Sequence, residues 1–464
     1  MPDSDPTREP EATRGSWASG SPPSARAAGE ARRNGRPAGV DAAHRAIDAV
    51  WRMESPRLIA GLARIVRDVG LAEDLAQDAL LAALEKWPEA GVPDNPGAWL
   101  MATARHRAID QLRRRQMLER KHEELAREVE MGPEKGEADL VEAIDDPVGD
   151  DLLRLIFTAC HPVLSMEARV ALTLRLLGGL TTEEIARAFL VPVATLAQRI
   201  VRAKRTLSEA HVPYEVPRGP ELANRLAGVL EVIYLIFNEG YSATAGDDWI
   251  RPTLCEEALR LGRVLAELAP EEPEVHGLVA LMEIQASRLK ARVGPGGEPI
   301  LLLDQDRGRW DRLLIRRGLA ALERAEWLGG ALGPYTLQAA IAACHARART
   351  ADETDWLRIV ALYDALAQLM PTPVVLLNRA VAVSMAYGPA AGLELVDRLT
   401  GEKVLERYHL LPSVRGDFLS KLGRYAEARV ELERAAALAG TAPERALLLE
   451  RAEKCRREEE KAGA

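Results

Sequence analysis

Aromatic and basic side chains share one face of the segment NPGAWLMATARHRAIDQLRRR, residues 95–115. At 100° per residue of an α-helix, this face carries an indole, an imidazole and several guanidinium groups. Aromatic rings stack on unpaired bases, and arginines contact the phosphates of a single strand. The segment therefore predicts a surface for unpaired nucleic acid, made of Trp99, Thr103, His106, Arg107, Asp110, Arg113 and Arg114.

The opposite face of the same helix is apolar and is expected to pack into a core. It consists of Met101, Ala108, Ile109 and Leu112. Taken alone, the segment also fits an ordinary solvated basic face, so DNA binding needs support from a second element.

The second element is TTEEIARAFLVPVATLAQRIVRAKRTL, residues 181–207, which has the pattern of a helix-turn-helix. Thr181 followed by Glu184 predicts a capping box at a helix start, and Pro192 predicts the end of that helix. In the next helix four residues recur at helical spacing and should be buried: Leu196, Ile200, Ala203 and Leu207. The other face has residue types that read base edges and bind phosphates in the major groove: Thr195, Gln198, Arg199, Arg202 and Arg205. An ordinary amphipathic surface helix is the alternative.

The formal net charge of −9 does not exclude nucleic acid, because phosphate contacts depend on local charge. Residues 99–121 hold seven Lys/Arg against two Asp/Glu, whereas residues 123–146 hold ten acidic residues against two basic ones. The average therefore hides a basic helix beside an acidic stretch.

Composition favours an all-α protein of two or three domains, because aromatics make up only 4% of 464 residues while helix formers abound. Breaks in the helical periodicity and Pro-rich stretches predict the boundaries. We expect a disordered tail at 1–40, a first helical domain at 41–118, an acidic linker at 119–150, a helix-turn-helix domain at 151–211, a Pro-rich hinge at 212–220, and a helical-hairpin array at 221–455.

The four cysteines are scattered without a C-x-x-C pair, so we expect reduced structural thiols and neither a metal nor another cofactor. No run of 18 apolar residues occurs, and the first residues do not resemble a signal peptide. The sequence therefore predicts a cytoplasmic protein without a membrane partner.

Two segments together resemble the extracytoplasmic-function (ECF) sigma factors of RNA polymerase. AEDLAQDALLAALEKW (72–87) followed by the basic helix is similar to their second conserved region, and residues 180–207 are similar to their fourth. The match covers residues 41–207. The long helical remainder resembles the subgroup whose sigma part is fused to a tetratricopeptide-like carboxyl-terminal domain.

This resemblance implies a set of roles. Core RNA polymerase would bind Asp74, Gln77 and Asp78. The loop with Asp94 and Asn95, and the helix from Trp99 to Arg114, would hold the non-template strand of the minus-ten element, while the helix-turn-helix would bind the duplex minus-thirty-five element. His106 departs from the family pattern, in which Asn is common, so base preference there is open.

In the remaining half, GRYAEARVELERAAALA (423–439) resembles the second helix of a tetratricopeptide repeat through Gly423, Tyr425, Ala428 and Ala435. An ordinary array of α-hairpins is the alternative. Two polar, Trp-containing stretches, 238–249 and 304–311, could indicate an enzyme, but the chain has no nucleophile elbow, phosphate loop or H-E-x-x-H motif. We therefore expect no catalysis, and loops that bind a ligand, a regulatory protein or the sigma domains in cis.

A helix-turn-helix transcriptional regulator with a repeat-type sensor domain is the alternative function. It explains residues 181–207 and the array, but it leaves the basic aromatic helix and its acidic neighbour unexplained. Dependence on core polymerase separates the two, because a repressor binds duplex promoter alone.

Overall fold

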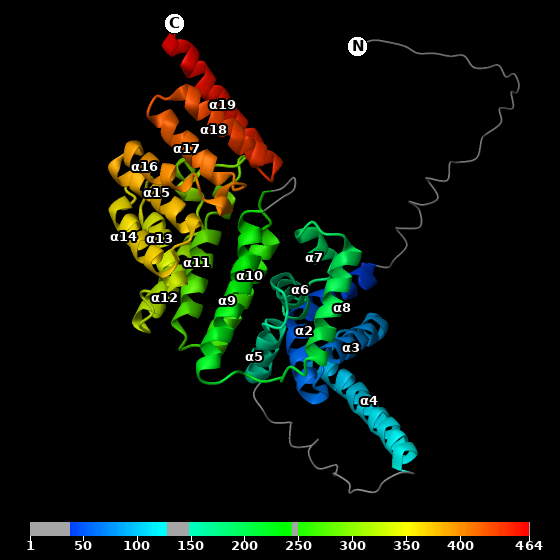
Figure 1. Ribbon diagram of the computed structural model, residues 1–464. Coiled ribbons are helices and arrows are strands. Elements are labelled where there is room, and N and C mark those ends of the chain that lie inside the picture. Colours follow the sequence, from blue (N-terminus) through cyan, green and yellow to red (C-terminus); the bar gives the residue numbers. More distant parts are fainter. Residues whose placement is uncertain (1–37, 128–147, 244–248, 464) are drawn as a thin grey trace, which may run out of the picture.

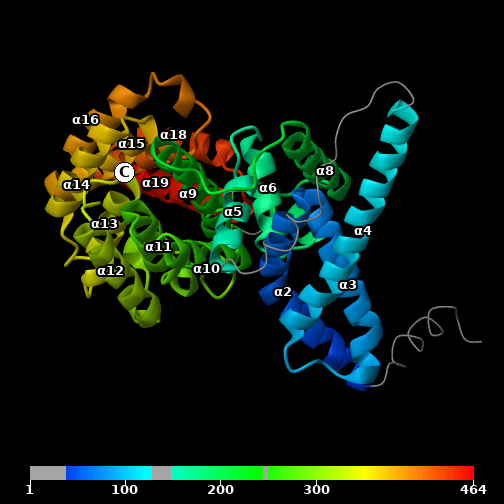
Figure 2. The same ribbon diagram turned by 90° about the horizontal axis from the view of Figure 1, so that it is seen from below.

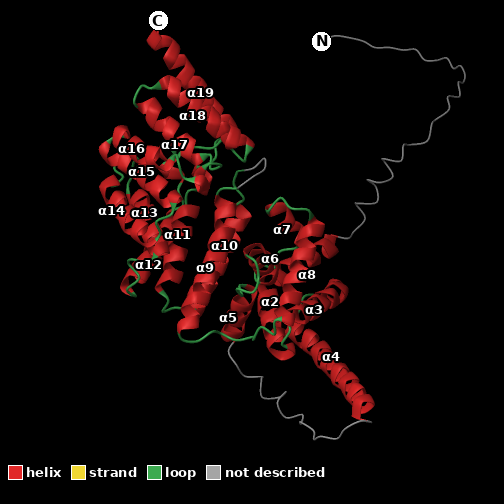
Figure 3. Ribbon diagram, viewed as in Figure 1, coloured by secondary structure: helices red, strands yellow, loops and turns green. Residues whose placement is uncertain are grey.

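The computed structural model describes residues 38–127, 148–243 and 249–463. Throughout these ranges the regular elements are helices and no strand is formed (Figure 3). The predicted all-α fold is confirmed. The predicted tail at 1–40 lies almost wholly outside the described residues, and α2 begins at Ala38.

The first helical unit consists of α2 (Ala38–Val66), α3 (Val69–Ala90) and α4 (Pro96–Arg127). Asp68 caps α3 by accepting a hydrogen bond from the backbone N–H of Leu71 at 2.8 Å. Small side chains on α3, Ala72, Ala76, Ala79 and Ala83, are buried and let the helices approach closely. Helix α4 continues to Arg127, into the stretch expected to be an acidic linker, and it projects beyond its neighbours (Figures 1 and 2).

The second helical unit consists of α5 (Val148–Ala159), α6 (Met166–Leu176), α7 (Thr182–Ala188) and α8 (Val193–Glu209). The capping box is confirmed, since Thr181 and Glu184 each accept a hydrogen bond from the other's backbone N–H. The expectation that Pro192 ends the first helix was wrong. Helix α7 ends at Ala188, and the turn passes through Leu190 with φ of 51° before Pro192 caps α8. A turn between crossing helices needs non-helical residues of its own, so the helix stops before the proline.

The extension is a succession of antiparallel helices that follow one another in contact along the chain (Figure 1). Six of them start with proline at the first turn, where its missing N–H costs nothing. The helices are α9 (Pro220–Tyr241), α10 (Pro252–Leu268), α11 (Pro273–Ala286), α12 (Arg312–Trp327), α13 (Pro334–Arg347), α14 (Trp356–Leu369), α15 (Pro373–Tyr387), α16 (Pro389–Leu399), α17 (Leu410–Lys421), α18 (Tyr425–Leu438) and α19 (Ala442–Gly463).

The repeat-like segment forms α18 and the turn that joins it to α17. Gly423 occupies the turn with φ of 74°, a conformation that favours glycine. Ala428 and Ala435 are fully buried against the neighbouring helices. The small residues at these spacings thus serve close helix packing.

A single hydrophobic core joins both helical units to the first helices of the extension. The Pro-rich segment between them is fastened to this core. The hydroxyl of Tyr214 lies 2.9 Å from the carbonyl oxygens of Ala60 and Asp151 and shares its proton between them. Burial raises the pKa of this phenol far above its usual value, so it remains a donor. The segment expected to be a hinge therefore bridges α2 and α5.

None of the helices in the described ranges is both long and apolar enough to cross a membrane. All four cysteines are free and buried, as expected for structural thiols.

Candidate nucleic-acid interfaces

Helix α8 separates its two faces as the sequence predicts. The row Leu196, Ile200, Ala203 and Leu207 is buried. Of the residues expected to face DNA, Arg199 is half-buried and the others are exposed, namely Thr195, Gln198, Arg202 and Arg205. Because Arg205 also pairs with Glu209 at 2.6 Å, Arg202 is the less constrained exposed cation. This face can present guanidinium and amide groups to a major groove.

One flank of α8 is engaged in a contact that the sequence did not reveal. Lys204 extends Nζ to within 2.5 Å of a carboxylate oxygen of Glu73 on α3, and Nε of Arg175 on α6 lies 2.7 Å from the other oxygen. Glu73 is only 2% exposed. Burial raises its pKa, but the two cations more than offset this, so the pKa lies below its usual value. The carboxylate is therefore ionised at neutral pH.

Two further polar contacts join the same pair of helical units. Arg52 on α2 binds Glu184 on α7 at 2.8 Å, and Oγ of Ser208 lies 3.2 Å from Asp68. Both are exposed, so they stabilise less than the buried Glu73 cluster. The helix-turn-helix is thus docked on the first helical unit.

Trp99 on α4 is half-buried rather than free. Its ring packs edge-on against the buried Trp87 of α3, with centroids 5.3 Å apart, and Nζ of Lys86 lies 6.0 Å from it. An edge-to-face pair holds the indole in place at little entropic cost on binding. The indole remains partly exposed to solvent.

The basic face of α4 is presented to solvent. Thr103 is half-buried, and the exposed members are His106, Arg107, Asp110, Arg113 and Arg114. Nδ1 of His106 lies 2.6 Å from the carbonyl oxygen of Ala102. A carbonyl only accepts, so Nδ1 is the donor in this contact and Nε2 is left for another partner.

The apolar face expected on α4 is only partly covered. Ala108 is buried, Met101 and Leu112 are half-buried, and Ile109 is 37% exposed. The expectation of a core position was wrong for Ile109. Periodicity identifies a face, but α4 projects past the helices that would cover it (Figure 2).

The loop before α4 contributes two exposed residues, Asp94 and Asn95. Asn95 caps the helix, because its Oδ1 accepts a hydrogen bond from the backbone N–H of Ala98 at 3.0 Å. The amide nitrogen of Asn95 is not used in this contact.

The residues expected to bind core polymerase lie on α3. Asp74 and Asp78 are exposed, and Asp78 lies 3.5 Å from Arg107 of α4. Gln77 is half-buried and donates to Glu73 at 2.7 Å. The outward carboxylates are therefore Asp74 and Asp78, while Gln77 supports the buried cluster.

The extension contacts the second helical unit through three arginines that sequence reasoning missed. Arg225 donates to the carbonyl oxygen of Phe157 at 2.9 Å, Arg251 donates to that of Ala188 at 2.5 Å, and Arg260 donates to that of Leu177. Contacts between residues so far apart in the sequence leave no local sequence pattern from which they could be predicted.

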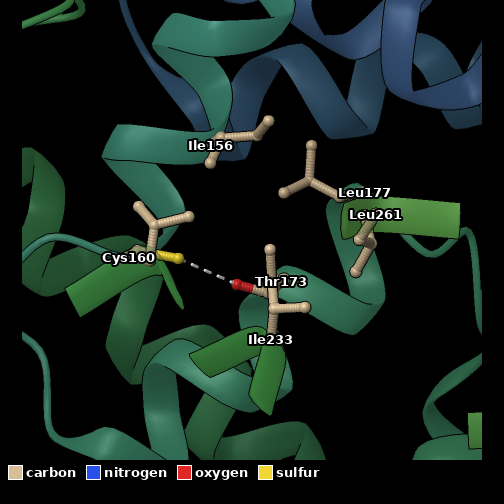
Figure 4. A pocket seen from close by; sticks show the side chains of 7 residues that line it. Ile156, Cys160, Thr173, Leu177, Ile233 and Leu261 are labelled. Atoms are coloured by element: carbon tan, nitrogen blue, oxygen red, sulfur yellow. Dashed lines mark hydrogen bonds between the residues drawn. The ribbon is translucent and has the colours of Figure 1, made fainter. Parts of the chain in front are cut away.

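A small apolar pocket lies beside this contact (Figure 4). Side chains from α5, α6, α9 and α10 line it, and Sγ of Cys160 lies 3.4 Å from Oγ1 of Thr173. Burial raises the pKa of Cys160 to about 11, so the thiol is protonated. The lining residues are Ile156, Cys160, Thr173, Leu177, Val229, Ile233 and Leu261.

The fold and these surfaces define a helical DNA-binding protein that carries a helix-turn-helix and a separate basic aromatic helix. Comparison with known families matches each of these two elements to a region of a known family. Residues 50–117 match Sigma-70 region 2, residues 154–207 match Sigma-70, region 4, and residues 225–326 match a family of unknown function (DUF6596).

Two relatives align with different shares of the chain. A protein of Rhizobium meliloti (strain 1021), described as "Uncharacterized protein R00370", is 43% identical over 87% of this chain and 94% of its own length. The "Probable ECF RNA polymerase sigma factor SigI" of Mycobacterium tuberculosis (strain ATCC 25618 / H37Rv) is 26% identical over 37% of this chain and 58% of its own length.

The chain carries regions 2 and 4 of the Sigma-70 family and resembles the ECF sigma factors, in a form with a large helical extension. It is a transcription initiation factor and not an enzyme. The alternative of a regulator with a sensor domain does not account for the match to region 2.

Proposed function

We propose that α3 binds core RNA polymerase through Asp74 and Asp78, and that α8 reads a duplex minus-thirty-five element. The loop at Asp94 and the basic face of α4 would hold the unpaired minus-ten strand. The observation that carries this proposal is the division of α8 into a buried apolar row and an opposite polar row that is mostly exposed. A factor that works on chromosomal promoters would act in the cytoplasm.

The energetics of melting suit such a surface. Stacking on an aromatic side chain contributes about 1–3 kcal/mol per base. Two or three captured bases would therefore offset the several kcal/mol that is lost when duplex stacking is broken. The factor makes and breaks no covalent bond and shifts the equilibrium by binding the melted strand.

We also propose that the extension regulates the sigma domains in cis by favouring a closed arrangement. The two promoter elements lie about 25 base pairs apart, which is roughly 85 Å at about 3.4 Å per base pair. In the structure α8 is in direct contact with α3 through Lys204 and Glu73. The two units must therefore separate before they can bind both elements.

The contacts of the extension support its role in this step. Arg251 and Arg260 donate to carbonyl oxygens at the ends of α7 and α6, and both helices belong to the unit that must move. A shared apolar core reinforces these hydrogen bonds. The extension thus holds the second helical unit where α8 meets α3.

Capture of DNA fragments tests the DNA-binding part. Core polymerase loaded with the full chain should retain a subset of genomic fragments, and R199A/R202A should lose that subset. R398A removes a charge that pairs with Glu394 at the surface of the extension and serves as the control. Retention of the same fragments by R199A/R202A would contradict the assignment of α8.

The regulatory part needs a separate test, because truncation could expose the apolar surface of α5 and α6. The full-length variant R251A/R260A and a chain that ends at Pro217, which keeps Tyr214, should both change promoter output. Equal output from these two proteins and the unmodified chain, under all conditions tested, would exclude regulation in cis.

A further inference from the structure

Three arginines of the extension are buried in one cluster of aromatic rings. Arg288, Arg292 and Arg307 are each 7% exposed. They flank η3 (Leu289–Ala291) and begin η5 (Arg307–Arg309), two short 3₁₀ turns that contact one another. This cluster lies within the residues that match the family of unknown function.

The rings bring together the two polar stretches that the sequence singled out. The guanidinium carbon of Arg292 lies 3.5 Å from the ring centroid of Tyr241 and 4.5 Å from that of Trp249. Arg288 lies 5.9 Å from Tyr241 and 5.7 Å from Trp310. Arg288 therefore connects the end of α9 to the 304–311 stretch.

The hydrogen-bond partners of these arginines are neutral. Arg288 donates to the hydroxyl of Tyr241 at 2.9 Å. Arg307 donates to the carbonyl oxygens of His345 and Ala348 at 2.7 and 2.9 Å and to the hydroxyl of Thr354 at 3.1 Å. In the described part of the chain, none of the three guanidinium groups forms an ion pair with a carboxylate.

Several buried donors in the cluster have no acceptor among the described residues. They are Nε of Arg288, one terminal nitrogen of Arg292, and the indole nitrogens of Trp249 and Trp310. A buried donor without an acceptor is costly, and a buried charge without a counter-charge is more so. Cation–π contacts offset only part of that cost.

Loss of a proton from the arginines does not remove the cost of burying these charges without a counter-charge. Burial lowers the pKa of Arg292 and the charge of Arg288 adds to the effect, but guanidinium groups stay protonated in proteins. His345 already yields its proton: burial, Arg288 and Arg307 lower its pKa to about 3. The cluster therefore carries three positive charges at neutral pH.

We propose that this cluster, built on Arg288 and Arg292, binds the oxyanion group of a small molecule, such as a phosphate or a carboxylate. Guanidinium groups match the geometry of these groups through paired N–H donors. The unpartnered indole N–H groups of Trp249 and Trp310 would supply further hydrogen bonds. The ligand thus completes a site that the chain leaves short of acceptors.

Binding of a ligand at this site would affect the helix-turn-helix through a short series of contacts. Trp249, which stacks on Arg292, lies two residues before Arg251, and Arg251 donates to Ala188 of α7. This coupling rests on the proposed regulation in cis, whereas binding itself does not.

Binding is tested on the full chain after exhaustive dialysis into an amine buffer with sodium chloride. Inorganic phosphate, sulfate and citrate are titrated by calorimetry and thermal denaturation at constant ionic strength. We expect saturable binding and a Tm that rises by several degrees with at least one anion. R292M should weaken binding at least tenfold, whereas R398M, far from the cluster, should bind as the unmodified chain does.

R292M also separates a lost site from a misfolded protein. It removes an uncompensated buried charge and keeps an apolar stem, so without anion its Tm should equal or exceed that of the unmodified chain. R292M with a lower Tm in anion-free buffer would contradict the proposal.

Three further results would overturn the proposal. One is the absence of binding by all three anions. Another is a weak shift that R292M shares with R398M, which would indicate an adventitious ion only. The third is a loss of stability in D247N/D248N without anion binding, since those carboxylates, outside the described residues, would then be the counter-charge. If an anion binds but promoter output does not change, the proposed binding site is supported and only its proposed coupling to the helix-turn-helix is rejected.

Discussion

A carboxylate oxygen of Glu73 on α3 and Nζ of Lys204 on α8 lie 2.5 Å apart, so a buried carboxylate of region 2 holds helix α8 of region 4. Arg175 completes the cluster from α6. These ions can leave water together because each cation compensates the carboxylate. Separation of the two regions would expose all three charged side chains to water. The contact is therefore stable when the regions are together, and no buried charge is left without a partner when they separate.

Glu73→Ala should lower the free energy of unfolding by roughly 3 kcal/mol, because it leaves two half-buried cations facing each other without a counter-charge. Urea denaturation of the full chain measures this. Asp74→Ala, one residue away and exposed, is the matched control and should change stability by less than about 0.5 kcal/mol. Equal stability of the E73A variant and the unmodified chain would show that the cluster does not join the regions.

The same Asp74→Ala substitution should weaken binding to core RNA polymerase, because an exposed carboxylate would be lost from the surface that faces basic partners. A reduction of about tenfold in affinity corresponds to about 1.4 kcal/mol. Affinity is measured by titrating labelled protein with core enzyme. Glu450, which is exposed on α19 at the far end of the extension, offers the control E450A. A similar loss in both variants would refute a specific role for α3.

Arg202→Ala should weaken promoter binding and make it less sensitive to salt. If Arg202 contacts a phosphate, the slope of log affinity against log salt should become shallower by about one unit. Holoenzyme is titrated with promoter DNA at several salt concentrations, and R398A serves as the control. An unchanged slope in the R202A variant would remove Arg202 from the interface.

His345 should make the chain lose stability as the pH falls below about 6.5. Its folded pKa is about 3 against an ordinary 6.5, so the unfolded chain binds the proton first. The stabilising effect is complete above pH 6.5 and decreases towards pH 3. His345→Gln should flatten that part of the stability profile, measured by urea denaturation at several pH values. Parallel profiles for the two proteins would contradict a buried neutral imidazole.

The sequence predicted those parts of the fold that depend on local pattern. The capping box at Thr181 and the buried row from Leu196 to Leu207 follow from residue types at fixed helical spacings. Ile109 shows the limit of this reasoning, because periodicity marks an apolar face without saying whether another helix covers it.

The contacts between distant parts of the chain could not be predicted in the same way. Lys204 lay beside the residues assigned to DNA, but nothing near it in sequence points to Glu73. The aromatic and polar stretches around Tyr241 and Trp310 stood out by composition, yet only the fold shows that Arg288 joins them. Long-range pairing of charges and rings follows from tertiary packing and leaves no periodic signal.

The most direct test of the account is run-off transcription with purified core RNA polymerase, the full chain and a pool of genomic fragments, with sequencing of the 5′ ends. We predict discrete start sites that share two upstream motifs and disappear with R199A/R202A. The same sites should appear at altered levels with R251A/R260A. No factor-dependent start, either with the full chain or with the chain that ends at Pro217, would contradict the account.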